Sequence, residues 1–369
     1  MKKNELDQMA DSVEKHAEDS PPQKIKLRRR DGLSTGSTLL NLACTSNPFI
    51  GFVRGKYYLL VGDSRAGKTF LAMTCFAEAC ISPVFKDYRL IYDNGEDGML
   101  MDVEKLFGKQ TARRLEPPRK EKGHPIFSYT VEDFYYHLDD AVETGKPFIY
   151  VMDSMDSLTS KQEGEKFQAH KRVARGRGKK GDDAGSYGDG KAKINSSGLR
   201  RMMSKLRDSG SILIILSQTR DNIGFGFEKQ SRSGGRALRF YATVEIWSKI
   251  TGQIKKVVRG KARPIGVHVG LHLKKNRITG KTPSVEMDIY PSFGIDDVGT
   301  CVDYLLDEGW WDKKKQTIEA GEFDFSGSRA NIIKRIEEEG WEQELRAIVG
   351  KCWAEIEAAS TPDRQRRYT

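Results

Sequence analysis

The chain has 369 residues, 37% of them hydrophobic, and carries a formal net charge of +10 at pH 7. Its apolar content suffices for a packed core, no run approaches the roughly 18 apolar residues of a membrane helix, and the charged N-terminus has no apolar signal region. We therefore expect a soluble, cytoplasmic protein without a membrane partner, and the positive charge favours a polyanionic one. The five cysteines lack CxxC spacing, which argues against a zinc site or a disulfide framework and is typical of reduced core thiols: Cys44, Cys75, Cys80, Cys301 and Cys352.

Residues 1–30 are predicted to form an N-terminal arm ahead of the core. Apolar residues at helical spacing precede two prolines and a basic run that ends at Arg30. Two interpretations stay open: a solvated tail, and a short helix that docks on a neighbouring subunit. The apolar residues are Leu6, Met9, Val13 and Ala17.

Four short apolar runs between residues 57 and 216 predict a parallel sheet. Each run is continuous rather than alternating in polarity, as in strands that are buried on both faces, and helical patterns separate the runs. Three later runs lie closer together and predict antiparallel hairpins at one edge. The first four are residues 57–61, 90–92, 148–152 and 211–216, and the later three are 241–247, 266–273 and 285–290.

The segment 161–193 is rich in glycine and basic residues and nearly free of large apolar ones. It contains ten Lys/Arg against five Asp/Glu. Such a segment cannot bury enough surface to fold alone, so we expect a mobile loop.

A small C-terminal unit is predicted to follow the core, which runs from residue 31 to 304. Trp310 and Trp311 precede a polar linker, and two amphipathic helical patterns follow at about 332–336 and 345–356. The linker and the unit together occupy residues 305–369, of which the last nine are polar and expected to fray.

A phosphate-binding loop is the most specific signal in the sequence. An octapeptide matches G-x-x-x-x-G-K-[ST], follows a predicted buried strand and precedes a predicted helix at 70–79. Its glycines let backbone N–H groups surround phosphate oxygens, Lys68 is expected to reach the β and γ phosphates of ATP, and Thr69 to ligate Mg²⁺. The octapeptide is Gly62, Asp63, Ser64, Arg65, Ala66, Gly67, Lys68 and Thr69.

A second acidic residue is needed beside this loop to complete the magnesium shell. Asp153 follows the run 148–152 directly and fits, because the carboxyl ends of neighbouring parallel strands meet at one edge of the sheet. Asp156 is the alternative candidate, and an ordinary helix N-cap is the alternative role for Asp153.

ATP hydrolysis also requires a carboxylate that orients the attacking water. Three acidic residues follow the run 90–92: Asp93, Glu96 and Asp97. Spacing alone does not choose among them.

With these residues in place, the chain resembles the bacterial RecA family from about residue 33 to 350. None of the other matching segments is specific to this family on its own. Their occurrence in the same order along the chain is specific, because a generic P-loop ATPase would have no reason to reproduce it. The resemblance implies an α/β fold, in which a RecA-like P-loop ATPase core has a mostly parallel central sheet flanked by helices. The segments are Leu33 to Ser37 with Leu39 to Asn41, Val151 to Ser154, Leu216 to Arg220 with Ile223-Gly224, Gly234 to Ala242, Lys274 to Ile278, and Gly309 to Trp311.

The resemblance also implies catalytic roles. Glu96 is similar to the family's water-activating carboxylate, although one extra residue in this stretch leaves Asp97 open. Gln218 resembles the glutamine that senses the γ-phosphate and relays its presence to a DNA-binding loop; the alternative is an ordinary polar strand end. Lys275 and Arg277 resemble a cationic pair that reaches the ATP of a neighbouring subunit, as an arginine finger would.

Two DNA-binding loops are implied, at about 161–198 and 221–235. Cations in the first could neutralise DNA phosphates, and two phenylalanines in the second could stack on bases. The alternatives are a solvent-facing charge run and aromatic packing on a neighbouring subunit. The predicted DNA-binding residues are Lys171, Arg172, Arg175, Arg177, Lys179, Lys180, Arg220, Phe225, Phe227, Arg232, Gly234 and Gly235.

The implied function is an ATP- and Mg²⁺-dependent recombinase that forms a helical homo-oligomeric filament on single-stranded DNA and pairs it with duplex DNA, in recombination and repair. Loader or single-strand-binding proteins are candidate further partners. The first loop is longer than the family's, and Arg364, Arg366 and Arg367 replace an acidic tail, which suggests a divergent, phage-encoded relative in a bacterial cell. The alternatives are a ring-forming helicase or translocase, a mediator that binds ATP and DNA without strand exchange, and a loop that grips RNA or another polyanion.

Overall fold

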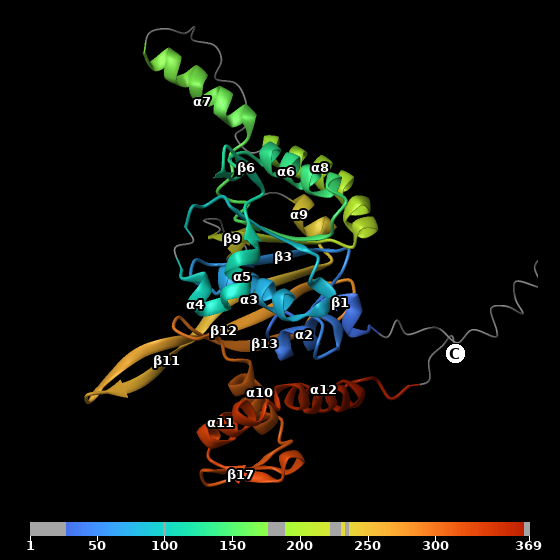
Figure 1. The fold of residues 1–369 in the computed structure, drawn as a ribbon, viewed down its shortest axis with the longest axis vertical. Helices are drawn as coiled ribbons and strands as arrows, with labels where there is room; N and C mark the ends of the chain where they lie inside the picture. The colour runs from blue at the N-terminus through green and yellow to red at the C-terminus, as the bar shows by residue number, and fades with distance from the viewer. Residues whose placement is uncertain (1–26, 99–100, 176–188, 222–229, 233–235, 365–369) are drawn as a thin grey trace, which may run out of the picture.

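A ten-stranded sheet forms the centre of the protein (Figure 1). The computed structural model describes residues 27–98, 101–175, 189–221, 230–232 and 236–364. From one edge to the other the strands are β14 (Gly294–Ile295), β13 (Ser284–Tyr290), β12 (Lys261–Asn276), β11 (Val244–Val258), β3 (Tyr57–Gly62), β9 (Ile212–Asp221), β8 (Phe148–Asp153), β4 (Arg89–Asn94) and β5 (Leu115–Glu116), and β10 (Gln230–Arg232) pairs with β9 outside this order.

The strand directions agree with the sequence prediction. The pairs from β11 through β3, β9, β8 and β4 to β5 are all parallel, whereas β11, β12, β13 and β14 pair antiparallel at the other edge. The prediction was wrong at residues 241–243, because the helix α9 (Arg236–Tyr241) comes first and β11 begins only at Val244. Buried Leu238 anchors this helix, so tertiary packing overrides the local β propensity of its aromatic residues.

Helices cover both faces of the sheet, as predicted, and two apolar clusters lie between them and the strands. On β3, Tyr58 and Leu60 belong to one cluster, and Tyr57, Leu59 and Val61 belong to the other. The first cluster includes buried residues of α2 (Thr38–Thr45) and α3 (Lys68–Ile81), and the second includes those of α6 (Val131–Glu143) and α8 (Asp189–Ser209). Every side chain of β3 is buried, which explains the continuous apolar run in the sequence.

Shorter elements complete the core. They are the helices α4 (Val103–Phe107) and α5 (Lys109–Arg114), the 3₁₀ turns Arg29–Asp31 and Pro83–Phe85, the strand pair β1 (Gly32–Leu33) with β2 (Phe52–Val53), and the pair β6 (Arg119–Glu121) with β7 (His124–Ile126).

The expectation of a loop throughout 161–193 was wrong, because residues 161–174 form the helix α7 (Lys161–Ala174) and α8 begins at Asp189. Ser160 and Glu163 form a reciprocal capping box that fixes the start of α7. No α7 residue is buried, and Figure 1 shows the helix projecting beyond α6 and α8. Low apolar content therefore predicted the lack of packing correctly, whereas local capping still allowed a helix.

The polar linker predicted after Trp311 is instead a three-stranded sheet of β15 (Asp312–Lys314), β16 (Thr317–Ala320) and β17 (Phe325–Gly327), with the 3₁₀ turn Gly321–Phe323. Ile318 and Ala320 on β16 are buried, so two apolar residues suffice to anchor it. The helices α11 (Arg329–Glu339) and α12 (Glu342–Ala359) follow as expected, and α10 (Asp297–Asp307) packs between them and the main sheet.

Four of the cysteines are buried and Cys80 is half-buried, and all five are free thiols, as the sequence indicated. None of the described helices is long and apolar enough to cross a membrane. The apolar repeat of the predicted arm lies in residues 1–26, outside the described part of the chain.

Candidate nucleotide-binding site

The predicted phosphate-binding loop connects the end of β3 to the start of α3, in the strand–loop–helix setting that the motif requires. Gly67 caps the helix with a left-handed backbone (φ 78°), and a Cβ at this position would lie 2.4 Å from Ile289 Cδ1. Only glycine fits both the conformation and the space. The N-terminus of α3, with its unpaired N–H groups and positive dipole, therefore faces the loop as an anion site.

Lys68 is held inside the loop. Its side chain is buried (8% exposed), and Nζ donates to the carbonyl oxygens of Gly62 at 2.7 Å and Asp63 at 2.8 Å. Burial lowers the pKa of Lys68, and the carboxylates of Asp153 and Glu96 oppose that shift. The ammonium is thus fixed by loop carbonyls at the position from which it can turn to phosphate oxygens.

Thr69 and Asp153 adjoin at the edge of the sheet. Thr69 Oγ1 donates to Asp153 Oδ2 at 2.8 Å, and the hydroxyl of Tyr92 donates to the same oxygen at 2.8 Å. Burial raises the pKa of Asp153, whereas these two hydrogen bonds lower it. A hydroxyl and a carboxylate side by side are oxygen ligands of the kind that Mg²⁺ takes, so the two residues fit the ion.

Asp156, the alternative candidate for the magnesium shell, contacts the backbone of β9 instead. Its Oδ2 accepts the backbone N–H of Gln218 at 2.6 Å and so braces the end of β9. The helix that follows β8 begins after its N-cap Ser160, so Asp153 does not cap a helix.

Glu96 follows β4 and contacts Ser154, directly after β8, and Gln218 on β9. Its Oε1 accepts a hydrogen bond from Gln218 Nε2 at 2.6 Å and another from Ser154 Oγ. Asp93 is fully buried instead, where it accepts from the backbone N–H of Ser128 at 2.8 Å and the hydroxyl of Tyr150 at 2.6 Å. Of the three candidate carboxylates, Glu96 is therefore the one that contacts Gln218, and Asp93 belongs to a structural network.

Gln218 stands beside the phosphate loop. In the parallel pairing of β3 with β9 it lies opposite Gly62, and the next residue, Thr219, donates from Oγ1 to Asp63 Oδ1. The phosphate loop, Glu96 and the end of β9 are thus joined by side-chain hydrogen bonds.

Tyr92, Ser154 and Thr219 had no predicted role in the site. Tyr92 carried a usable signal, because its hydroxyl sits in a run that is otherwise fully apolar and ends beside Asp93. Ser154 and Thr219 directly follow Asp153 and Gln218, and only the three-dimensional arrangement shows what they contact.

Lys275 and Arg277 lie at the opposite end of the sheet from Lys68. Asn276, between them, pairs with Val244, which in turn pairs with Tyr58 at the start of β3. The phosphate loop begins where that strand ends, so at about 3.3 Å per residue the two places are on the order of 15 Å apart. Both cations instead donate to the carbonyl oxygen of Phe240, at 2.9 Å from Lys275 and 2.8 Å from Arg277.

The predicted DNA-binding residues are described only in part. Lys171, Arg172 and Arg175 are exposed at the end of α7, and β10 pairs with the last residues of β9, where Arg220 lies opposite Ser231 and Arg232 opposite Thr219. The side chains of Arg220 and Arg232 are not described. The remaining predicted residues lie outside the described part of the chain: Arg177, Lys179, Lys180, Phe225, Phe227, Gly234 and Gly235.

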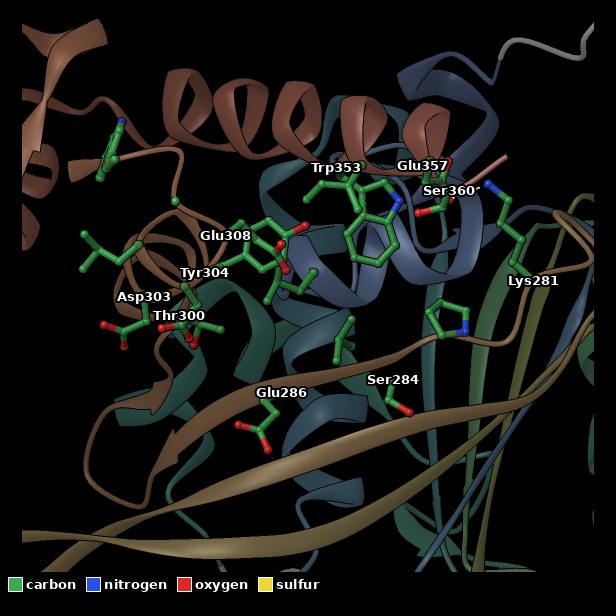
Figure 2. A pocket seen from close by; sticks show the side chains of 18 of the residues that line it. Lys281, Ser284, Glu286, Thr300, Asp303, Tyr304, Glu308, Trp353, Glu357 and Ser360 are labelled. Carbon is green, nitrogen blue, oxygen red and sulfur yellow. Dashed lines mark ion pairs between the residues drawn. The ribbon is translucent and has the colours of Figure 1, made fainter. Parts of the chain in front are cut away.

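A cavity of about 1170 Å³ lies apart from the phosphate loop. It lies between β12 and β13 on one side and α10 and α12 on the other, and carboxylates such as Glu286 and Asp303 line it together with aromatic rings. Figure 2 shows Trp353 extending from α12 toward the strand that carries Ser284. No residue of the octapeptide contributes to this cavity.

Comparison with known proteins agrees with the fold. The model of the RecA N-terminal domain family matches residues 142–296, which include Asp153, Gln218 and Lys275. Protein RecA of Chlorobaculum tepidum is 25% identical over 315 residues, covering 83% of this chain and 79% of that protein. Protein RecA of Chlorobaculum parvum is 26% identical over 335 residues, covering 89% and 83%. Protein RecA of a Caulobacter species is 27% identical over 288 residues, covering 77% and 70%.

The phosphate loop, the Thr69–Asp153 pair, and the sheet order with its antiparallel edge are thus found in a chain that aligns with RecA proteins over most of its length. The chain is therefore similar to the RecA N-terminal domain family over residues 142–296 and to RecA proteins over most of its length, which supports a divergent relative of RecA.

Proposed function

We propose that this protein is a DNA-dependent ATPase that forms filaments on single-stranded DNA and promotes homologous pairing and strand exchange. The observation that carries the proposal is the hydrogen bond between Gln218 Nε2 and Glu96 Oε1 (2.6 Å). It joins a candidate hydrolytic carboxylate to the strand that leads into residues 221–235, where the resemblance places a DNA-binding loop.

The phosphate loop binds ATP, with Lys68 at the β and γ phosphates and the backbone N–H groups of residues 62–69 around their oxygens. Thr69 and Asp153 hold Mg²⁺, which when bound neutralises charge on the phosphates. The hydrogen bond from Tyr92 keeps Asp153 Oδ2 directed toward Thr69. Burial of Lys68 strengthens its attraction to the nucleotide phosphates, and burial of Asp153 strengthens its attraction to Mg²⁺, since the site has a lower dielectric constant than water.

Glu96 orients the attacking water, and Gln218 controls whether the Glu96 carboxylate is available to that water. The Gln218 amide donates to Glu96 Oε1. When the terminal phosphate of ATP takes this amide instead, Glu96 is free to accept a proton from water. The same movement of Gln218 shifts the end of β9, which leads into the proposed DNA-binding loop, so nucleotide state and DNA grip are coupled.

Lys275 and Arg277 act on the ATP of a neighbouring subunit. They lie at the end of the sheet that is remote from their own phosphate loop, so a head-to-tail arrangement is required to bring them to a nucleotide. Repeated, this heterologous contact builds an open helical filament, with ATP between subunits and cations that stabilise developing phosphate charge.

The basic segments around α7 and residues 220–235 hold the DNA. Lys171, Arg172 and Arg175 are exposed on an element that contributes nothing to the core, as is suitable for contact with phosphates. Such contacts are independent of sequence, which a protein that tests any homologous pair requires.

ATP hydrolysis measured with and without single-stranded DNA, for the wild type and Lys68→Ala, tests this proposal, together with electron microscopy of the same mixtures. We expect DNA-stimulated turnover that the substitution abolishes, and helical filaments in the presence of ATP. Closed rings would instead indicate a translocase, and DNA binding without stimulated turnover would indicate a recombination mediator.

A further inference from the structure

The cavity between the main sheet and the helices α10 and α12 is strongly acidic. Seven carboxylates line it, against two lysines and one histidine. Three of the carboxylates are paired with Lys281, His268 and Arg329, at N···O distances of 2.6–2.7 Å. The other four carboxylates, and of the lining cations only Lys313, form no ion pair with any residue that the structure describes. A polycation is therefore the ligand that this cavity attracts. The four carboxylates are all exposed: Glu286, Asp307, Glu308 and Asp312.

Aromatic rings make the cavity more suitable for arginine than for lysine. The rings of Tyr304 on α10 and Trp353 on α12 lie 6.2 Å apart between centroids. Trp353 extends toward the strand that carries Ser284 (Figure 2), and its buried Nε1 has no hydrogen-bond partner in the described part of the chain. A planar guanidinium stacks on such rings and pairs with two carboxylate oxygens at once, whereas an ammonium is a compact, strongly hydrated charge.

The chain itself brings arginines to the rim of this cavity. Thr361 and Pro362, directly after α12, belong to the lining. The backbone N–H of Arg364 donates to the carbonyl oxygen of Pro362 at 2.9 Å, a three-residue turn that changes the direction of the chain as it leaves the helix. Residues 364–369 contain no acidic residue and three arginines: Arg364, Arg366 and Arg367.

We propose that the arginine-rich segment 364–369 docks in the acidic cavity of its own chain and holds α12 against the main sheet. The segment is long enough, because six extended residues span up to about 20 Å. Trp353 lies only about 10 Å back along the helix from Ser360 at the rim. Three guanidinium groups then meet the four unpaired carboxylates, so the charges of the segment and the cavity nearly cancel. This docking replaces the frayed end that the polarity of the segment predicts, and it does not depend on the proposed function.

Hydrogen exchange of the full-length protein tests the docking. A tail variant replaces the three arginines by glutamine, and a control variant replaces three exposed lysines of β11 and β12 that lie outside the cavity. At low salt, amides of residues 300–309 and 353–360 should exchange about five- to tenfold faster in the tail variant, because several ion pairs are lost together. The control should match the wild type, and equal exchange in all three proteins would overturn the proposal. The variants are Arg364→Gln/Arg366→Gln/Arg367→Gln and Lys255→Gln/Lys256→Gln/Lys261→Gln.

Salt identifies the kind of contact. Because the Debye length falls to about 3 Å at 1 M salt, exchange in the wild type should approach that of the tail variant there. A difference that persists at 1 M salt would contradict docking by ion pairs.

A charge exchange identifies the two partners. Arg366→Glu/Arg367→Glu and Glu286→Arg/Glu308→Arg should each accelerate exchange around the cavity, since each brings like charges together. The protein that combines all four substitutions should regain most of the wild-type protection. Additive acceleration in the combined protein would mean that the segment and the cavity do not meet.

Dilution and a soluble polycation distinguish the other occupants. The protection should be independent of protein concentration, and its loss on dilution would place the segment in the cavity of a neighbouring copy. Spermine at millimolar concentration should protect the tail variant and leave the wild type unchanged. Equal added protection in both proteins would mean that the wild-type cavity is open to any polycation, which would overturn the proposal.

Discussion

At the scale of single residues, Glu96 and Asp97 are the two carboxylates that the sequence left as alternatives. Glu96 contacts Gln218 and Ser154, whereas Asp97 is exposed in a left-handed conformation (φ 52°). Glu96→Gln should reduce kcat by about 10²-fold or more, because a positioned general base contributes that much. Asp97→Asn is the matched control and should leave turnover within about threefold of the wild type. The reverse result in a steady-state ATPase assay would move the role to Asp97.

Tyr92 supplies a second prediction at this scale. Tyr92→Phe removes one hydrogen bond to Asp153 Oδ2 without a change of shape. A hydrogen bond to a charged group contributes about 1.5 kcal/mol or more, so the Mg²⁺ concentration that gives half-maximal hydrolysis should rise roughly tenfold, with little change in the melting temperature. Tyr88→Phe, whose hydroxyl bonds to the Gly210 carbonyl far from the loop, should leave the Mg²⁺ dependence unaltered. An unchanged Mg²⁺ dependence in Tyr92→Phe would refute this role for Tyr92.

Asp153 links stability to pH. Its pKa is raised by burial, so in the folded protein its ionised form is disfavoured relative to the unfolded chain. The native state then binds more protons, and this group's contribution to stability falls as pH rises from the unfolded pKa through the raised folded one. Asp153→Asn should therefore raise the free energy of unfolding of the nucleotide-free protein at pH 7 while it abolishes hydrolysis. Urea titrations without Mg²⁺ at pH 7 and at pH 4 measure this, and the gain should shrink at the lower pH; a destabilised variant at pH 7 would contradict it.

At the scale of elements, α7 and α6 begin with the same capping box but differ in packing. Ser160 and Glu163 cap α7, which buries nothing, whereas Thr130 and Asp133 cap α6, which packs on the sheet. Loss of either cap costs about 1 kcal/mol of helix stability. Ser160→Ala should thus accelerate amide exchange in residues 161–174 about fivefold without a change in melting temperature, and Thr130→Ala should lower the melting temperature. A global destabilisation by Ser160→Ala would mean that α7 is packed.

Elements with a strong local pattern could be predicted from the sequence alone. The buried strands β3, β4, β8 and β9 were predicted because their apolar runs reflect burial on both faces. The phosphate loop was predicted because its chemistry tolerates few residue types. The helix α7 was missed because a capping box and helix-forming residues outweighed its low apolar content.

Contacts between distant segments were beyond the reach of sequence reasoning. Three segments of the chain supply Glu96, Ser154 and Gln218, and only the parallel order β3-β9-β8-β4 brings them together. The short strands β15 to β17 were read as a linker, because two buried residues in β16 are too few to give a pattern.

At the scale of the whole molecule, the separation of Lys275 and Arg277 from their own phosphate loop predicts complementation between subunits. Lys68→Ala and Lys275→Ala/Arg277→Ala should each be inactive alone. In an equimolar mixture, roughly a quarter of the interfaces combine an intact loop with an intact cationic pair, so about a quarter of the wild-type ATPase activity should return. A mixture that stays inactive would exclude action across the interface.

Strand exchange is measured by the release of a fluorescent strand from a homologous duplex by preformed complexes of the protein with single-stranded DNA. We predict release that requires ATP and homology, is absent with a heterologous duplex, and is lost in Lys68→Ala. Stimulated ATP hydrolysis without any release of the homologous strand would contradict the recombinase account.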